Sequence, residues 1–396
     1  MMVFFQSLFF ISLLFGQLVR FPLIQGITVY AHDLMIVLLL AYWMFRKPKR
    51  KLNFTLFIPL KVFFLVALVS LAVNSFTQPF NAFLEGLAYC IRFFLYSGLY
   101  FVVSGERRIR WEIFLYRTGV VFTLLGIIQY VLYPNLRNLS YLGWDPHYYR
   151  LFSTFLDPNF AGLFIVVTFF LGLHIYRIVK KKYWIIFSQL LLIIALILTL
   201  SRSSWLAFLV PFVWLIWKKR LWKFFIGIGI FIICLFFLPL PYRQITPIFR
   251  QETALARANN WIYSIELVKQ KPIFGYGFNL LRSIQEPVTS QPVDSQLSHA
   301  SAGLDNSFLF VLVTTGIIGG TAWIYLLVSM GKMGIYLMRS KKNTMLGETY
   351  ILTISAICIH SLFVNSLFYP WIMIWMWILA GVVEGKRKDS EPRPKT

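Results

Sequence analysis

The amino-acid sequence predicts an all-α integral membrane protein, a polytopic bundle of about twelve transmembrane helices. Of its 396 residues, 58% are apolar and only 13% are charged, whereas soluble domains are about 45–50% apolar and about 25% charged. The mean hydropathy is +0.70. The basic residues are clustered in short connections between long apolar runs, which is typical of a membrane protein.

The predicted spans follow from apolar runs that approach the length of about 20 residues needed to cross a bilayer. They cover residues 2–19, 30–45, 54–73, 83–103, 113–133, 160–176, 183–200, 204–217, 224–242, 306–330, 348–364 and 370–384. The first run has no basic segment before it and no small-residue cleavage site, so we interpret it as a spanning helix rather than a signal peptide.

The distribution of charge predicts that both termini lie in the cytoplasm. Every second connection is then cytoplasmic, and these connections contain most of the 38 basic residues. The short external connections contain only Arg20, Arg137, Arg150 and Arg202. The net charge of +23 therefore sets orientation in the membrane, and we expect no nucleic-acid partner.

One connection is unusually long. Residues 243–304 form a predicted external loop between the ninth and tenth spans, and residues 252–270 show the apolar spacing of an amphipathic interfacial helix. Residues 1–385 thus form one transmembrane domain, and residues 386–396 a disordered cytoplasmic tail. The cysteines Cys90, Cys234 and Cys358 all lie in apolar runs, which makes disulfides and metal sites unexpected.

Four polar segments fall on the predicted external face, and the first covers residues 150–162. Asp157 or Asn159 could cap a helix with Pro158 in its first turn, but a cap does not explain Arg150. The second segment is the hairpin 199–207, where Arg202 is flanked by serines that include Ser201. Arg202 could extend to the lipid headgroups, but the serines favour a polar pocket.

The third and fourth segments add two arginines and a carboxylate. Arg250 and Arg257 are seven residues apart and so share a helix face. That face could bind phosphates or lie against anionic headgroups. Asp305 begins the tenth span, where it could be a helix cap or a general base. The glycines between residues 316 and 320 would allow close helix packing.

Taken together, these segments resemble the O-antigen ligase and O-antigen polymerase superfamily of bacterial envelope polysaccharide enzymes. The resemblance covers about residues 150–320 and rests on four motifs in order. They are Ser-Thr-Phe-x-x-Pro-Asn at 153–159, Thr-x-Ser-Arg at 199–202, Arg257 and Trp261 followed by Pro-x-x-Gly-x-Gly at 272–277, and Asp-Asn-Ser at 305–307 before Gly-Ile-Ile-Gly at 316–319.

The resemblance implies an enzyme that uses a polyprenyl-diphosphate-linked oligosaccharide as donor and a glycan as acceptor. Arg202 and Arg257 match the arginines that bind the donor diphosphate, and Arg150 and Arg250 are further candidates. Asp305 stands where the ligases have a basic histidine, which favours a polymerase and leaves ligase as the alternative. His299, six residues earlier, is a candidate to supply the imidazole that the ligases have at this position. The residues expected to support the site are Asn159, Ser201, Trp261 and Asn306.

The same resemblance implies direct displacement with inversion at the anomeric carbon, without a metal or another cofactor. It also implies a bacterial cytoplasmic membrane protein whose active site faces outward, with membrane lipids around it and a chain-length regulator or flippase as partner. A transporter or flippase is the rival from another class, since Lys61, Arg92 and Arg117 lie in or near spans and Glu85 could pair with Arg92. A cell-wall glycan polymerase lacks matching motifs, and no internal repeat supports a transporter.

Overall fold

The computed structural model describes residues 2–24, 27–45, 54–106, 108–142, 144, 146–220, 251–281 and 304–390. This part of the chain is mostly helical. Its α-helices are α1 (Met2–Leu14), α2 (Ala31–Phe45), α3 (Phe57–Asn74), α4 (Phe80–Gly105), α5 (Trp111–Leu132), α6 (Pro158–Ile178), α7 (Lys182–Leu198), α8 (Arg202–Lys218), α11 (Gln251–Gln270), α13 (Ser307–Arg339), α14 (Thr344–His360) and α15 (Pro370–Ser390).

The helices agree with the predicted spans wherever the two can be compared. Each predicted span within the described residues coincides with a helix, while the ninth span, residues 224–242, lies outside them. Among the described residues, the helices long and apolar enough to cross a membrane are α3, α4, α5, α6 and α13, and shorter apolar helices accompany them. The chain is therefore a multi-pass helical membrane protein. The number of spans and the side of each terminus remain predictions.

The structure adds one short β-hairpin to the predicted all-α bundle. Strands β1 (Arg20–Ile24) and β2 (Ile27–Tyr30) form an antiparallel pair between α1 and α2, in which Phe21 lies opposite Val29. This stretch is too short to span a bilayer, and its β-branched residues favour an extended backbone.

At the other end of the chain, α15 continues to Ser390, so the predicted tail begins within a helix.

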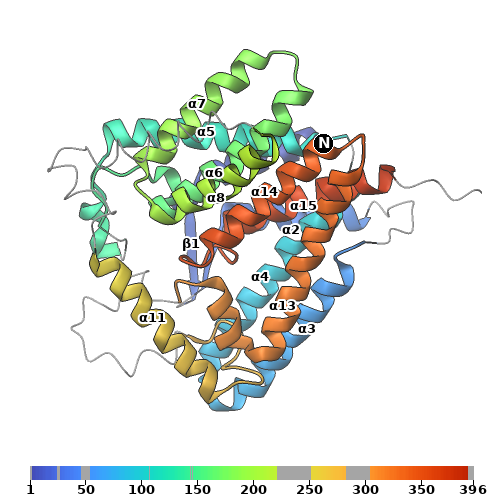
Figure 1. Ribbon diagram of the computed structural model, residues 1–396. Helices are drawn as coiled ribbons and strands as arrows, with labels where there is room; N and C mark the ends of the chain where they lie inside the picture. The colour runs from blue at the N-terminus through green and yellow to red at the C-terminus, as the bar shows by residue number, and fades with distance from the viewer. Residues whose placement is uncertain are drawn as a thin grey trace, which may run out of the picture.

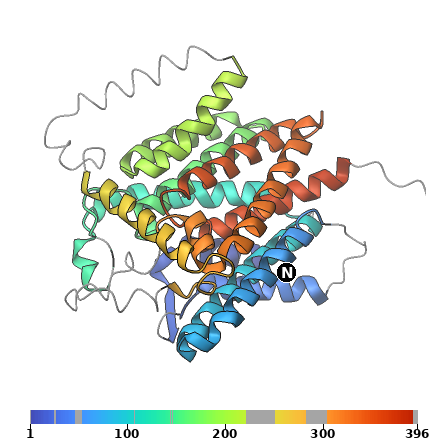
Figure 2. The same ribbon diagram turned by 60° about the horizontal axis from the view of Figure 1, so that its bottom comes forward.

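The helices pack in two groups around a shared core. In one group α3 and α4 lie side by side, with α13 against α3 and α15 against α4. In the other, α6 contacts α5, α7, α8 and α14. Figure 2 shows the α3–α4 pair and the α7–α8 pair on opposite sides of the bundle. Helix α11 lies at the edge of the molecule beside α13 (Figure 1).

The two ends of the bundle differ in charge. At one end, which we call the basic end, two buried glutamates bind basic side chains. Glu348 forms ion pairs with Lys218 (2.9 Å) and Lys219 (3.0 Å), and Glu384 forms one with Arg387 (3.0 Å). The basic end thus gathers residues of the predicted cytoplasmic connections, and the polar motif segments lie at the starts of α6, α8 and α13.

Arg92, one of the charged residues that the sequence places in a span, has a partner on α2. Arg92 forms an ion pair with Asp33 at 3.2 Å, and it also contacts the rings of Tyr30 and Tyr89. Asp33 also accepts a hydrogen bond from the Tyr96 hydroxyl. The buried charge of Arg92 is therefore matched within the fold by Asp33, which the sequence pattern did not indicate.

Candidate active site

The start of α6 is built as the capping preference predicts. The Asp157 side chain accepts a hydrogen bond from the Asn159 backbone N–H (2.6 Å), and Pro158 occupies the first helical position. Burial raises the pKa of the Asp157 carboxyl, and the hydrogen bond from Asn159 and the charges of Arg150 and Arg257 partly oppose this. Asp157 is thus a cap that also lies within reach of two arginine charges.

The serine-rich hairpin before α8 is joined directly to the start of α6. The Ser201 hydroxyl donates to Asn159 Oδ1 (2.8 Å), and the Ser204 hydroxyl donates to the Asn159 carbonyl oxygen (3.1 Å). Ser201 is also the N-cap of α8, which makes Arg202 the first residue of that helix. The first and second motif segments therefore meet, and Arg202 stands at their junction.

Arg150 has a structural role that the sequence did not reveal. Its guanidinium donates to the carbonyl oxygens of Thr199 (3.0 Å) and Leu200 (3.2 Å), just after α7 ends. A cation at a helix C-terminus satisfies carbonyls that have no partner within the helix. Arg150 therefore fixes the position of the hairpin, and this hairpin carries Arg202.

The start of α13 separates the two roles considered for Asp305. The cap is Asn306, whose side-chain oxygen accepts hydrogen bonds from the backbone N–H groups of Phe308 (2.8 Å) and Leu309 (3.1 Å). Asp305 is half-buried and makes no hydrogen bond with any residue in the described part of the chain. Its carboxylate is therefore not used as the helix cap.

Arg257 on α11 connects the remaining segments. Burial raises the pKa of the Asp305 carboxyl, the charge of Arg257 lowers it, and the charge of Asp157 raises it again. The charges of Arg257, Asp157 and Asp305 thus act on one another, although they come from α11, α6 and α13. Trp261 lies one turn after Arg257, with its ring 6.1 Å from that of Phe363.

The glycine motifs form a backbone clasp rather than a nucleotide loop. The Tyr276 and Gly277 N–H groups donate to the carbonyls of Val313 and Thr314 (2.9 Å each), and Ile317 N–H donates to Pro272 O (2.8 Å). Gly316 breaks α13 with a φ of 66°, and a Cβ atom there would lie 2.1 Å from the Ile273 carbonyl oxygen. The clasp joins the end of α11 to the break in α13 and so places Arg257 relative to Asp305.

His360 is part of this region, but the sequence analysis missed it. It is the last residue of α14, is fully buried, and lies within hydrogen-bonding distance of Ser203 and Ser204 (3.1 and 3.2 Å). The available signal was a histidine at the end of an apolar run, followed closely by polar residues. A lone histidine of this kind is common in buried cores, so the pattern alone did not indicate a site.

Two predicted candidates, Arg250 and His299, lie outside the described residues. Among the residues that are described, no group of three or more histidine, cysteine, aspartate or glutamate side chains is arranged to hold a metal ion.

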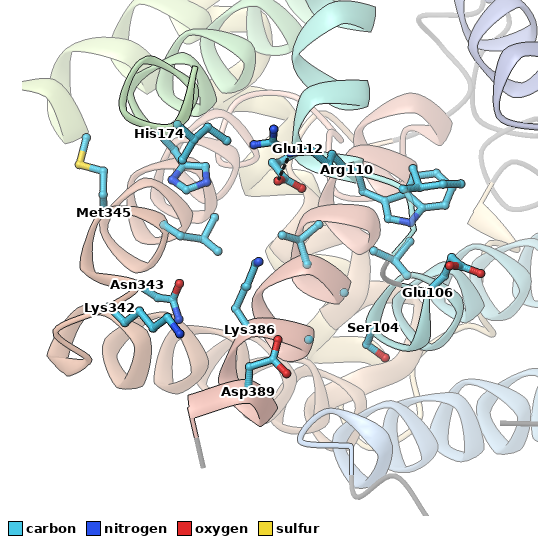
Figure 3. A pocket seen from close by; sticks show the side chains of 18 of the residues that line it. Ser104, Glu106, Arg110, Glu112, His174, Lys342, Asn343, Met345, Lys386 and Asp389 are labelled. Atoms are coloured by element: carbon cyan, nitrogen blue, oxygen red, sulfur yellow. Dashed lines mark ion pairs between the residues drawn. The ribbon is translucent and has the colours of Figure 1, made fainter. Parts of the chain in front are cut away.

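A cavity of about 520 Å³ lies at the basic end rather than beside these residues. Figure 3 shows it between the Arg110–Glu112 ion pair, His174 and Lys386. It is lined by the C-terminal end of α6, whereas the motif residues surround the N-terminal end. Because a helix of 21 residues is about 30 Å long at about 1.5 Å per residue, the cavity and the motif residues form separate sites.

Comparison with known proteins gives two matches. A family model described as O-antigen ligase matches residues 187–324, which include the second, third and fourth motif segments. A general O-oligosaccharyltransferase of Acinetobacter baylyi is 25% identical over 341 residues, or 79% of this chain. The chain spans 58% of the length of that relative. The chain is therefore similar to O-antigen ligases over residues 187–324 and to an oligosaccharyltransferase over most of its own length.

Proposed function

We propose that this protein transfers a glycan from a polyprenyl-diphosphate-linked donor to an acceptor hydroxyl. Ligation to an acceptor replaces polymerisation as the main interpretation, because the family model is described as a ligase and the relative as an oligosaccharyltransferase. The observation that carries the proposal is that Arg202, Arg257 and Asp305 lie at one end of the bundle. Arg202 begins α8, Arg257 lies on α11, and Asp305 directly precedes the cap of α13.

The two arginines would bind the donor diphosphate. A guanidinium group offers a planar fork of N–H donors that matches phosphate oxygens. As the glycan leaves, negative charge grows on the diphosphate, and fixed cations stabilise that state more than the ground state. Arg202 would be held by the hydrogen-bonded hairpin and Arg257 by the clasp, so neither would need to reorganise during the reaction.

Asp305 would act as the general base. Its carboxylate removes the proton from the acceptor hydroxyl while that oxygen forms a bond with the anomeric carbon of the donor glycan. The bond between that carbon and the diphosphate oxygen breaks at the same time, and the lipid diphosphate leaves with the electron pair. A single displacement of this kind inverts the anomeric carbon, and the residues named here supply its base and its charge stabilisation without a metal.

The location of the site supports a reaction on the outer face of the cytoplasmic membrane. Lys218, Lys219 and Arg387, from described parts of the predicted cytoplasmic connections, lie at the basic end, and candidate residues lie at the starts of α6, α8 and α13. This arrangement agrees with an orientation in which basic residues face the cytoplasm. The donor glycan would then be used after it has crossed the membrane.

The direct test is a transfer assay with the purified full-length protein in lipid vesicles. A polyprenyl-diphosphate-linked oligosaccharide is supplied with and without an acceptor that carries a free hydroxyl. A ligase attaches one glycan to the acceptor and makes little product without it. A ladder of lengthened lipid-linked glycan in the absence of acceptor would instead show a polymerase, and no loss of donor under either condition would refute glycan transfer.

A further inference from the structure

His360 has hydrogen-bonding partners on both ring nitrogens. Its Nε2 atom lies 3.1 Å from the Ser203 hydroxyl and 3.2 Å from the Ser204 hydroxyl, and its Nδ1 atom lies 2.6 Å from the Ser366 hydroxyl. The side chain is 0% exposed. A buried histidine with partners on both nitrogens has a defined ring orientation, and none of the motif segments contains it.

The hydroxyl partners indicate which nitrogen carries the proton. The Ser366 hydroxyl donates to the Val364 carbonyl (3.3 Å), so its oxygen is left to accept from His360 Nδ1–H. Nε2 is then the acceptor for the Ser203 hydroxyl. Ser204 has the Asn159 carbonyl as its own acceptor. With His360 neutral, each hydrogen-bond donor of His360, Ser203, Ser204 and Ser366 has an acceptor.

The Nε2 side of His360 holds the helix start that carries Arg202. Ser203 and Ser204 follow Arg202 directly in the first turn of α8. The same turn is bonded to Asn159 at the start of α6 through Ser201 and Ser204. The fully buried imidazole therefore supports this turn from the C-terminal end of α14, on the side where the turn meets the Asn159 carbonyl.

The Nδ1 side leads to the helix start that carries Asp305. Ser366 belongs to residues 361–369, which join α14 to α15. Three hydrogen bonds tie this connection to Ser307: Ser307 N–H to Ser361 O (2.9 Å), the Ser307 hydroxyl to Asn365 Oδ1 (2.9 Å), and Leu367 N–H to the Ser307 hydroxyl (3.2 Å). Ser307 is two residues after Asp305, so the position of this connection determines where the carboxylate lies.

We propose that His360 is a positioning residue that holds Arg202 and Asp305 at a fixed separation, so that donor diphosphate and acceptor hydroxyl meet in register. The inference rests on the proposed function and adds a residue from outside the family-matched region, which ends at residue 324. His360 does not touch either substrate. It acts through two sets of hydrogen bonds, which we call its two arms. One set joins Nε2 to the turn that carries Arg202, and the other joins Nδ1 to the connection that holds the start of α13.

Two substitutions test the arms separately. The amide of Asn reaches about as far as Nδ1, so His360→Asn keeps the bond to Ser366 and loses the bonds to the hairpin. The amide of Gln reaches about as far as Nε2, so His360→Gln does the reverse. We expect His360→Asn to raise the donor KM about 10-fold with little change in kcat, and His360→Gln to lower kcat by a similar factor with the donor KM kept. Both are measured in the vesicle transfer assay, per amount of folded protein.

A matched control is His32→Asn. His32 is also 0% exposed, but it lies between aromatic rings, 5.2 Å from Tyr30 and 4.7 Å from Trp371, and away from both arms. We expect this variant to lose folded protein without changing KM or kcat. A purely structural role for His360 would give the same result for its own variants.

Ser203→Ala with Ser204→Ala provides a test that leaves the histidine in place. Alanine is a good helix former, so α8 should form, and the donor KM should rise as in His360→Asn. The inference is overturned if the wild type transfers glycan while the serine variant and both His360 variants keep its KM and kcat. Failure of the wild type to transfer any glycan would refute the proposed function instead.

Discussion

At the scale of single residues, the polar side chains near the site fall into two groups. Asp157, Ser201 and Asn306 cap helices, and Arg150 holds the hairpin. Asp305 and Arg257 make no hydrogen bond with any described residue, yet the charge of each acts on the other. Because Asp305 and Arg257 are not used to hold the backbone, we propose that they contact substrate, and the chemical predictions concern them.

The first prediction concerns the base. Asp305→Asn keeps the size of the side chain but removes its basicity, so kcat should fall by about 10²–10⁴-fold. Donor binding should be retained, because a carboxylate repels a diphosphate. The same change at the basic end, Asp389→Asn, controls for loss of a carboxylate and should leave kcat unchanged. A turnover of Asp305→Asn within a few-fold of wild type would assign the base to another group.

The second prediction concerns pH. Burial raises the pKa of the Asp305 carboxyl above its usual value of 3.8. A base must be deprotonated, so kcat should fall on acidification, and the fall should begin at a pH above that expected for an exposed aspartate. A kcat profile over pH 4–8 in vesicles measures it. In Asp305→Asn the residual activity should lose this acid limb, and an unchanged limb in that variant would contradict the assignment.

The third prediction concerns the donor diphosphate. Arg257→Lys keeps the positive charge but loses the planar fork of N–H donors, so the donor KM should rise about tenfold or more, since each charge-assisted hydrogen bond contributes about 1.5–3 kcal/mol. Arg202→Lys should behave alike. Arg137→Lys is the control, because Arg137 is exposed and lies over the Tyr148 ring, 4.2 Å from its centroid. Wild-type KM in both Arg257→Lys and Arg257→Ala would remove Arg257 from the site.

At the scale of elements, the break in α13 explains why both glycine motifs are present. The backbone of residues 272–277 pairs with residues 313–317. Helix α3 supports the same contact through Ser70, whose hydroxyl donates to the carbonyls of Phe274 (2.7 Å) and Thr314 (2.8 Å). An unbroken α13 would have satisfied the carbonyls of Val313 and Thr314 within the helix. Helix α11 is attached by this clasp, while its side chains Leu255, Ile262 and Ile265 remain exposed, as expected of a helix at a membrane interface.

The fourth prediction tests the clasp. Gly316→Ala forces a side chain into a positive φ and against the Ile273 carbonyl, so it should lower the free energy of unfolding by at least about 1–3 kcal/mol and reduce transfer activity. Gly331→Ala, in the same helix, meets no atom within 4 Å and should be neutral or slightly stabilising. Thermal unfolding in detergent compares the two, and equal midpoints for both variants would exclude a role for the clasp in stability.

At the scale of the whole molecule, the ion pairs of the buried glutamates and the candidate active site lie at opposite ends of the bundle. The basic end contains the buried glutamates Glu348 and Glu384 with their basic partners and the 520 Å³ cavity. The starts of α6, α8 and α13 contain the candidate active site. The buried Arg92 is paired with Asp33, so its charge needs no transport pathway to explain it, which weakens the rival interpretation as a transporter.

The fifth prediction tests the orientation. Single cysteines are introduced at Asn135, which follows α5 at the active-site end, and at Asn343, which lines the cavity at the basic end. In intact cells a membrane-impermeant thiol reagent should label Asn135→Cys and spare Asn343→Cys, and both should react after the membrane is permeabilised. Labelling of Asn343→Cys in intact cells would reverse the orientation and place the proposed site in the cytoplasm.

The sequence by itself determined the helices and the candidate chemical groups. Apolar run length locates the helices because the requirement to span a bilayer is local to each segment, and every predicted span that can be compared coincides with a helix. Arg202 and Asp305 were found because charged groups next to apolar runs are conspicuous, and Arg257 because it shares a helix face with Arg250. The tertiary structure decided which of these groups meet, and which are used otherwise. Asn306 rather than Asp305 caps α13, Arg150 binds carbonyls, and His360 joins two helix starts. Those outcomes depend on contacts between residues as much as 157 positions apart in the chain, which the pattern of neighbouring residues does not encode.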